Sequence, residues 1–147
     1  MKYNLQMRDL YIDSFQCELN PKDNKESLKV ILDVASELGY SQNIETMVAV
    51  KITVVLKLEN ESQSGALPFV KVGEISTVNV FDCTLEATRT KVINGEIIVE
   101  DELLNFMINI AYNNTRGLLR ERGNGTLMGN IVLPLMGPEG INPQNRK

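Results

Sequence analysis

The residue types that most often carry out catalysis or bind metals are scarce in this sequence. It contains 147 residues and no histidine. This excludes a serine or cysteine nucleophile activated by an imidazole, and it excludes histidine metal ligands. The two cysteines, Cys17 and Cys83, are too few for a zinc cluster and are not spaced as a CxxC redox pair. We expect two half-buried thiols in a reducing compartment.

Carboxylates are the remaining candidates for acid–base chemistry. Glu74 with Asp82, and Glu100 with Asp101, lie close enough in the sequence to be considered as pairs. Without histidine, a metal cluster or a phosphate-binding loop, such carboxylates are more often solvated charges. The Gly-Asn-Gly stretch at 123–125 follows an expected helix and precedes none, so it does not match a nucleotide-binding loop. The sequence therefore favours a protein that is not an enzyme and needs no cofactor or metal.

Composition and charge indicate one ordinary globular domain, spanning residues 1–147. Hydrophobic residues make up 43% and charged residues 23% of the chain, which is usual for soluble proteins. The net charge is -4 and the basic residues are scattered, whereas a nucleic-acid binder usually carries a basic face. We find neither a signal-peptide pattern nor an apolar run approaching ~18 residues, so we expect a cytoplasmic protein without membrane insertion.

Four segments alternate apolar and polar residues in the manner of β-strands. They cover residues 3–19, 28–38, 46–60 and 67–80. The alternation slips near Asp9, which predicts a β-bulge in the first strand. Gly73, inside the fourth strand, predicts a further bulge or a close approach of the backbone to a neighbour. Because loops join these segments, including residues 39–45, we expect an antiparallel meander.

The next region is ambiguous, and a helix follows it. Residues 81–100 allow either a short strand pair that turns at Asn94-Gly95 or an irregular link, and we favour the link because the first arm is short. From Asp101 onward apolar residues recur at helical spacing, and Gly123 suits the helix end. Gly117 inside this helix indicates either close packing against a neighbouring helix or simple tolerance of one glycine.

An apolar segment follows the helix, over residues 126–138 (TLMGNIVLPLMGP). Gly129 and Pro134 interrupt it, so we expect an extended segment that lies over the sheet or the helix. The expected fold class is therefore α+β. It consists of a four-stranded antiparallel sheet that is packed by one long helix and a C-terminal apolar segment.

An ordered series of segments carries a family resemblance. Residues 5–18 (LQMRDLYIDSFQCE) and 69–78 (FVKVGEISTV) look like the first and fourth strands of a known fold, with residues 28–60 between them. The block 108–138 is the most specific, chiefly through Tyr112, Arg116, Gly125, Thr126, Leu133 and Pro134. In this order and spacing, the segments resemble SecB, the bacterial export chaperone, and its SecB-like relatives.

The resemblance implies a sheet with helices on one side, assembled as a dimer of dimers, and surface grooves that bind unfolded or precursor polypeptides. Exposed apolar surface rimmed by polar groups, with flexible methionines, would suit varied clients. The candidate peptide-binding residues are Phe69, Leu127, Met128, Ile131, Leu133 and Leu135. For each of these residues taken alone, burial in the core is the open alternative.

The resemblance also bears on docking to the motor protein SecA, which family members contact through acidic residues and a tail. The candidate partner-binding residues are Glu18, Leu67 and Phe69. Glu18 matches one acidic position, but Phe69 stands where another acidic residue is expected, and the tail ends in Arg146-Lys147. These departures weaken the expectation of SecA docking and fit a SecB-like chaperone that serves another partner, such as an antitoxin.

Two functional hypotheses follow. In the first, the protein is a holdase chaperone that binds unfolded or precursor polypeptides in the cytoplasm, with export as one destination of its clients. In the second, it is a SecB-like oligomeric interaction module that binds no unfolded chains. The two differ in whether the apolar candidates form an exposed groove or lie buried within the subunit.

Overall fold

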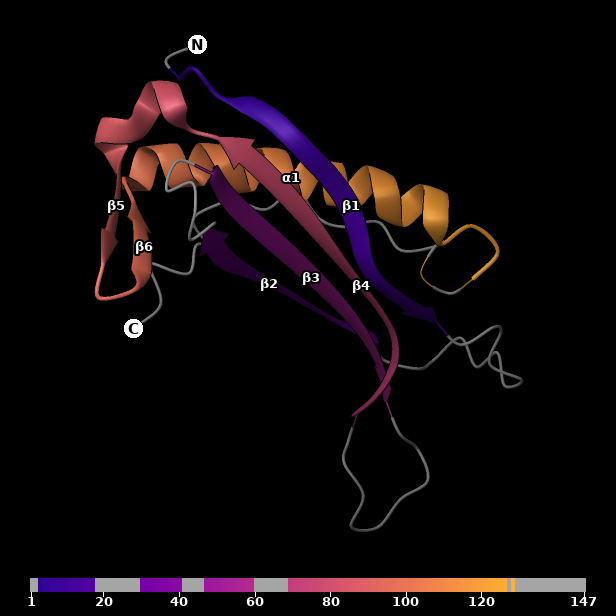
Figure 1. Ribbon diagram of the computed structural model, residues 1–147. Helices are drawn as coiled ribbons and strands as arrows, with labels where there is room; N and C mark the ends of the chain where they lie inside the picture. The colour runs from indigo at the N-terminus through magenta and orange to yellow at the C-terminus, as the bar shows by residue number, and fades with distance from the viewer. Residues whose placement is uncertain (1–2, 18–29, 41–46, 60–68, 127, 129–147) are drawn as a thin grey trace.

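The computed structural model describes residues 3–17, 30–40, 47–59, 69–126 and 128. Four long strands come first: β1 (Gln6–Cys17), β2 (Val30–Tyr40), β3 (Met47–Glu59) and β4 (Phe69–Asp82). A short 3-10 helix η1 (Thr84–Arg89), a hairpin of β5 (Thr90–Ile93) and β6 (Glu96–Val99), and the helix α1 (Asp101–Arg122) follow. The expected α+β class, with a four-stranded antiparallel sheet and one long helix, is confirmed (Figure 1). The expected C-terminal apolar segment lies outside the described residues, apart from Thr126 and Met128.

The expected meander is wrong in one connection. The strand order is β1-β4-β3-β2, so β1 pairs with β4 and not with β2. This is the order of a Greek key, in which three hairpin-connected strands are joined by a fourth through a long connection. Residues 18–29 provide that connection, and twelve residues can span up to ~40 Å when extended, enough to cross four strands. The connection between β1 and β2 is therefore long enough for β1 to pair with either β2 or β4, and its length does not determine the partner.

Irregularities in strand pairing occur where the sequence predicts them. The register between β1 and β4 shifts between Met7 and Asp9, which confirms the bulge near Asp9, and it shifts again between Ile12 and Ser14. The register between β3 and β4 shifts beside Gly73. Bulges increase the local twist of the strands that carry them.

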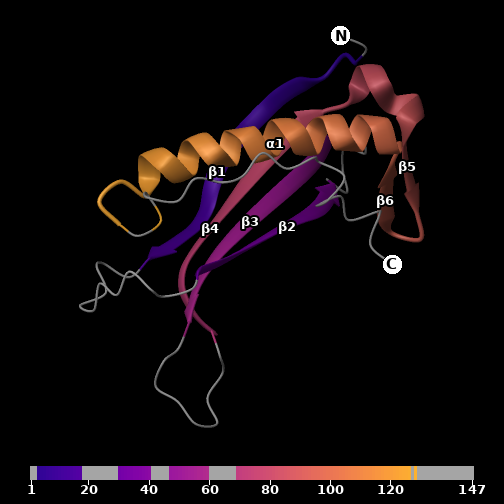
Figure 2. The same cartoon turned by 180° about the vertical axis from the view of Figure 1, so that it is seen from behind.

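The core lies between α1 and one face of the sheet, mainly over β3 and β4 (Figure 2). The β-branched row of β3 is fully buried because it faces this helix, as the alternation of the segment indicates. The helix contributes the opposite side through residues spaced three and four apart. The largest buried side chains are Val48, Val50, Ile52, Val54, Ile75, Phe81, Leu103, Leu104, Met107, Ile108, Leu119 and Met128.

Buried polar side chains determine where the helix sits on the sheet. The hydroxyls of Thr77 and Thr115 lie 2.7 Å apart, and Thr115 also donates to the carbonyl of Ala111 at 2.7 Å. The Asn114 amide donates to the side-chain oxygen of Asn79 at 3.1 Å. Because an unsatisfied buried hydroxyl or amide is costly, a slide or rotation of the helix would break these bonds and be penalised.

Gly73 makes room for Met128. A Cβ atom at position 73 would lie 2.6 Å from the Met128 sulfur and 3.4 Å from the Cys17 sulfur. The close approach that the sequence predicts at Gly73 is therefore confirmed. Gly117, by contrast, is exposed, and among the residues that the structure describes no side chain packs against it.

We expect the two glycines to respond to alanine with opposite signs. Gly73→Ala should destabilise the protein by about 1–2 kcal/mol because Met128 must move out of a packed site. Gly117→Ala should stabilise it by about 1 kcal/mol because a helix interior disfavours glycine. Urea unfolding of both variants measures this. A stabilised Gly73→Ala would contradict the packing described for Met128.

Candidate functional site

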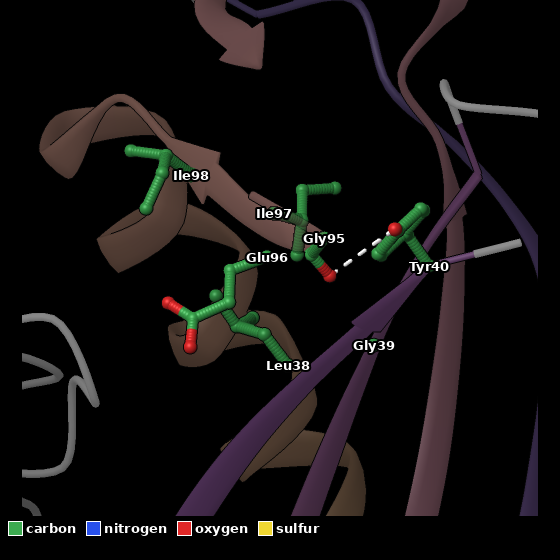
Figure 3. A pocket seen from close by; sticks show the side chains of 7 residues that line it. All are labelled: Leu38, Gly39, Tyr40, Gly95, Glu96, Ile97 and Ile98. Atoms are coloured by element: carbon green, nitrogen blue, oxygen red, sulfur yellow. Dashed lines mark hydrogen bonds between the residues drawn. The ribbon is translucent and has the colours of Figure 1, made fainter. Parts of the chain in front are cut away.

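A pocket of about 730 Å³ opens between the end of β2 and the β5–β6 hairpin (Figure 3). Pockets of roughly 300–1,000 Å³ are the usual size for binding small ligands or side chains. Its walls are mainly aliphatic or backbone, with one carboxylate and one phenol hydroxyl. The lining residues are Leu38, Gly39, Tyr40, Gly95, Glu96, Ile97 and Ile98. The site is therefore suited to apolar groups and to a polypeptide backbone.

The hairpin that forms one wall is built on the Asn94-Gly95 turn. Both residues adopt left-handed conformations, with φ of 52° and 80°, as a two-residue hairpin turn requires. The preference for an irregular link over residues 81–100 is therefore wrong. The turn residues outweigh the shortness of the arms, and the backbone N–H of Glu100 extends the pairing by donating to the Arg89 carbonyl at 2.8 Å.

Successive side chains of the hairpin point alternately toward the core and toward the surface. Ile97 and Val99 are buried, with exposures of 7% and 1%. Ile93 and Ile98 lie on the opposite face and are 52% and 40% exposed. The hairpin is thus anchored on one side and presents apolar surface on the other.

The other wall comes from a strand that extends beyond its predicted end. Gly39 and Tyr40 were expected in a loop, but they pair with Ala49 and Val48 as the last residues of β2. The Tyr40 hydroxyl donates to the Gly95 carbonyl at 3.2 Å and so joins the strand to the hairpin turn. This bond connects the two walls of the pocket.

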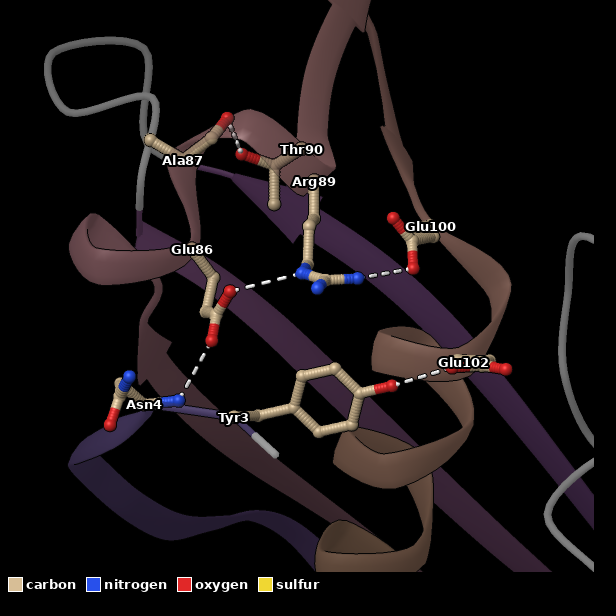
Figure 4. Close-up of polar contacts among 8 residues, drawn as sticks. All are labelled: Tyr3, Asn4, Glu86, Ala87, Arg89, Thr90, Glu100 and Glu102. Carbon is tan, nitrogen blue, oxygen red and sulfur yellow. Dashed lines mark hydrogen bonds and ion pairs between the residues drawn. The ribbon is translucent and has the colours of Figure 1, made fainter. Parts of the chain in front are cut away.

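A cluster of charged and polar residues holds the base of the hairpin (Figure 4). Glu86 is only 7% exposed, and its two oxygens accept from the Asn4 backbone N–H at 2.9 Å and from Arg89 at 3.1 Å. Arg89 also donates to Glu100, which raises the arginine pKa, and its guanidinium lies 5.4 Å from the Tyr3 ring centroid. The cluster ties the start of the chain, η1 and the beginning of α1 together.

Removing the arginine should loosen the hairpin. Arg89→Met leaves the buried carboxylate of Glu86 without its cation, and unpaired buried charge is costly. We expect a lower urea midpoint and faster amide exchange in β5 and β6. Lys57→Met is the matched control, because Lys57 pairs with Asp33 on the surface, where such pairs contribute little. Equal effects of the two variants would show that the cluster does not hold the hairpin.

Of the candidate peptide-binding residues, only Met128 has a described side chain. It is fully buried, as expected for a residue of the core, and it packs against Gly73. Gly73 pairs with Leu56, whereas Tyr40 pairs with Val48 at the other end of β3, so Met128 lies away from the pocket. Phe69 begins β4, but its side chain lies outside the described residues, as do Leu127, Ile131, Leu133 and Leu135. Their peptide-binding role stays a prediction.

The candidate partner-binding residues Glu18 and Leu67 also lie outside the described residues. Of the carboxylates considered for catalysis, Glu74 and Asp82 do not form a pair, because they lie eight positions apart along β4. Glu74 contacts Lys71, while Asp82 accepts from Thr84 and Arg8, which lower its pKa to about 2. Burial raises the pKa of the Cys83 thiol to about 11, and Cys17 and Cys83 are not joined by a disulfide.

The described residues provide neither a cluster of metal ligands nor a membrane-spanning helix. They contain no cluster of three or more histidine, cysteine or acidic side chains placed to hold a metal ion. They also contain no helix that is both long and apolar enough to cross a membrane.

Comparison with known proteins decides the fold. No family model matches the sequence, and no curated protein matches it significantly. Among solved structures, the chain is similar to the Mycobacterium tuberculosis SecB-like chaperone Rv1957, solved with a ChAD peptide from the HigA1 antitoxin. The TM-score is 0.61 at 14% identity, and the match covers 90% of each chain. The fold is SecB-like. Within this SecB-like fold, the pocket at β2 and the hairpin is the candidate binding site.

Proposed function

We propose that this protein is a cytoplasmic holdase chaperone that binds unfolded polypeptides. One observation carries the proposal: on a SecB-like fold, the pocket presents aliphatic side chains and strand edges together, which suits an extended apolar segment. Its lining combines aliphatic side chains with exposed polar groups, much of them backbone, so it suits the backbone and apolar side chains of many sequences. Chaperone function at this site requires no catalytic group, metal or cofactor.

A partner of the antitoxin type fits this proposal better than SecA. The related structure is a complex with an antitoxin peptide, which is a polypeptide ligand of a SecB-like fold. At the position where the resemblance expects a second acidic docking residue, this chain has Phe69. We therefore propose a peptide segment of a partner protein as the specific ligand. Mixing the protein with SecA should give no complex by size-exclusion chromatography.

Suppression of aggregation tests the chaperone proposal. A denatured substrate protein, diluted into buffer with a stoichiometric excess of this protein, should scatter less light than the substrate alone. The scattering should return when an apolar competitor peptide is added, because the pocket is then occupied. Equal aggregation with and without the protein would reject the chaperone function.

A second candidate is an oligomeric interaction module, and the edge strand β1 favours it. Met7, Leu10 and Tyr11 on this strand are 40%, 36% and 45% exposed, which leaves apolar side chains along an open sheet edge. Such edges are usually covered in native assemblies. We propose that copies of the chain associate through β1, in line with the expected dimer of dimers. Sedimentation of a Leu10→Lys variant, compared with the wild type, measures this, and an unchanged oligomer would place the contact elsewhere.

A further inference from the structure

Both walls of the pocket are strand edges to which no described strand is paired. β2 is the last strand in the order β1-β4-β3-β2, and the hairpin has only two strands. β6 lies on the side of the hairpin that faces β2, with β5 outside it (Figure 1). Strand edges carry rows of backbone donors and acceptors, and native proteins usually cover them or block them. Here two such edges border the same pocket, whose lining offers both aliphatic side chains and polar groups.

The turn determines which backbone groups of β6 are already used. In a two-residue hairpin turn, the residues that flank the turn form the first hydrogen-bonded pair. Here these residues are Ile93 and Glu96. Hydrogen-bonded and non-hydrogen-bonded pairs alternate along an antiparallel ladder. Lys91 and Ile98 therefore form the next hydrogen-bonded pair.

The same alternation directs Ile97 toward the pocket. The bond from the Glu100 N–H to the Arg89 carbonyl continues the series of hydrogen-bonded pairs and supports this phase. Val92 and Ile97 therefore form a non-hydrogen-bonded pair. The backbone N–H and C=O of Ile97 point away from β5 and toward the pocket, and no described group bonds to them.

We propose that an extended client segment binds by adding a third strand to the β6 edge inside this pocket. This deepens the proposed chaperone function and rests on it. The client backbone would bond to Ile97, while its apolar side chains would contact Leu38 and Ile98. Backbone bonds do not depend on side-chain identity, so this mode suits varied sequences. A third strand would also stabilise the hairpin, because two-stranded sheets are marginal on their own.

N-methylated peptides separate backbone pairing from side-chain contact. The probe is a fluorescein-labelled peptide of alternating leucine and threonine with a lysine at each end. It is compared with two versions that are N-methylated at every odd or at every even position. Methylation on the parity that faces β6 removes the bonding N–H groups, so one version should bind about tenfold more weakly or worse. The other version should bind nearly as well as the unmodified peptide.

The outcomes of this experiment are distinct. Equal binding of all three peptides would overturn strand addition, because it would show that the pocket recognises client side chains and not the backbone. The chaperone proposal would stand. Failure of every peptide to bind, the unmodified one included, would count against the chaperone proposal itself and would remove the basis for strand addition.

Hydrogen exchange at Ile97 provides a second readout. Its amide should exchange fast in the free protein and slow down when the unmodified peptide is bound, because only then does it have an acceptor. The amide of Ile98, which already bonds to β5, is the internal reference. An Ile97 amide that is protected in the free protein would place another segment of the chain on this edge. That result, or no slowing in the complex, would overturn the proposal.

Discussion

Replacing Ile98 with aspartate is expected to abolish client binding while the protein stays folded. Ile98 lines the pocket on the exposed face of β6, with 40% of its surface accessible, so the change removes little core packing. A client segment would have to cover the new carboxylate next to that of Glu96, and desolvating unpaired like charges is costly. We expect client affinity to fall at least about tenfold, with a change in stability within about 1 kcal/mol.

The control for this variant is Leu85→Asp. Leu85 is a more exposed apolar residue, at 73%, and it lies in η1 outside the pocket lining. The Leu85→Asp substitution, like Ile98→Asp, replaces an aliphatic side chain with a carboxylate and changes the net charge by the same amount. Titration of a labelled unfolded polypeptide should show wild-type affinity for Leu85→Asp and weak binding for Ile98→Asp. Equal loss in both variants would mean that general surface hydrophobicity, and not this pocket, binds clients.

The second large effect is expected from Gly95→Val. Gly95 has φ of +80° and no neighbouring atom within 4 Å of a built Cβ, so only the backbone conformation opposes a side chain there. A β-branched residue in this region costs about 1–3 kcal/mol. The two-stranded hairpin has little stability of its own to offset that strain. We expect β5 and β6 to open and the pocket to lose one wall, so that client affinity falls about tenfold or more.

Gly125→Val imposes the same strain elsewhere. Gly125 has φ of +84° and also has open space around it, but it follows the end of α1 and does not line the pocket. Both variants should lower the unfolding temperature, whereas only Gly95→Val should weaken client binding. Wild-type client affinity in Gly95→Val, measured where the protein is folded, would show that the hairpin is not part of the site.

Local patterns predicted most of the secondary structure because the period of apolar residues reports directly on strands and helices. The alternating row from Val48 to Leu56 and the helical spacing from Leu103 to Leu119 both face the core. The pairing of β1 with β4 was not predictable in this way. It depends on contacts between residues about 70 positions apart, such as Tyr11 with Val78, and alternation is the same whichever strand is the neighbour.

The pocket was missed for a related reason. Its two walls are about 55 positions apart in sequence, and the sequence pattern favours a loop over Gly39 and Tyr40 and an irregular link over residues 81–100. Asn94-Gly95 is the available signal for the hairpin, but arms of four residues are too short to decide between hairpin and link, although most of their residues are β-branched. Tertiary contacts decide it: the cluster around Arg89 and the burial of Ile97 stabilise a two-stranded hairpin that would be marginal on its own.

Site-specific photo-crosslinking tests the central claim most directly. A benzophenone amino acid is placed at position 98 in the pocket and, in a second variant, at position 85 outside it. With an unfolded client present, irradiation should give a client adduct from position 98 and little from position 85, and the folded form of the client should give none. A client that binds but crosslinks equally from both positions, or only from position 85, would contradict the assignment of this pocket as the binding site.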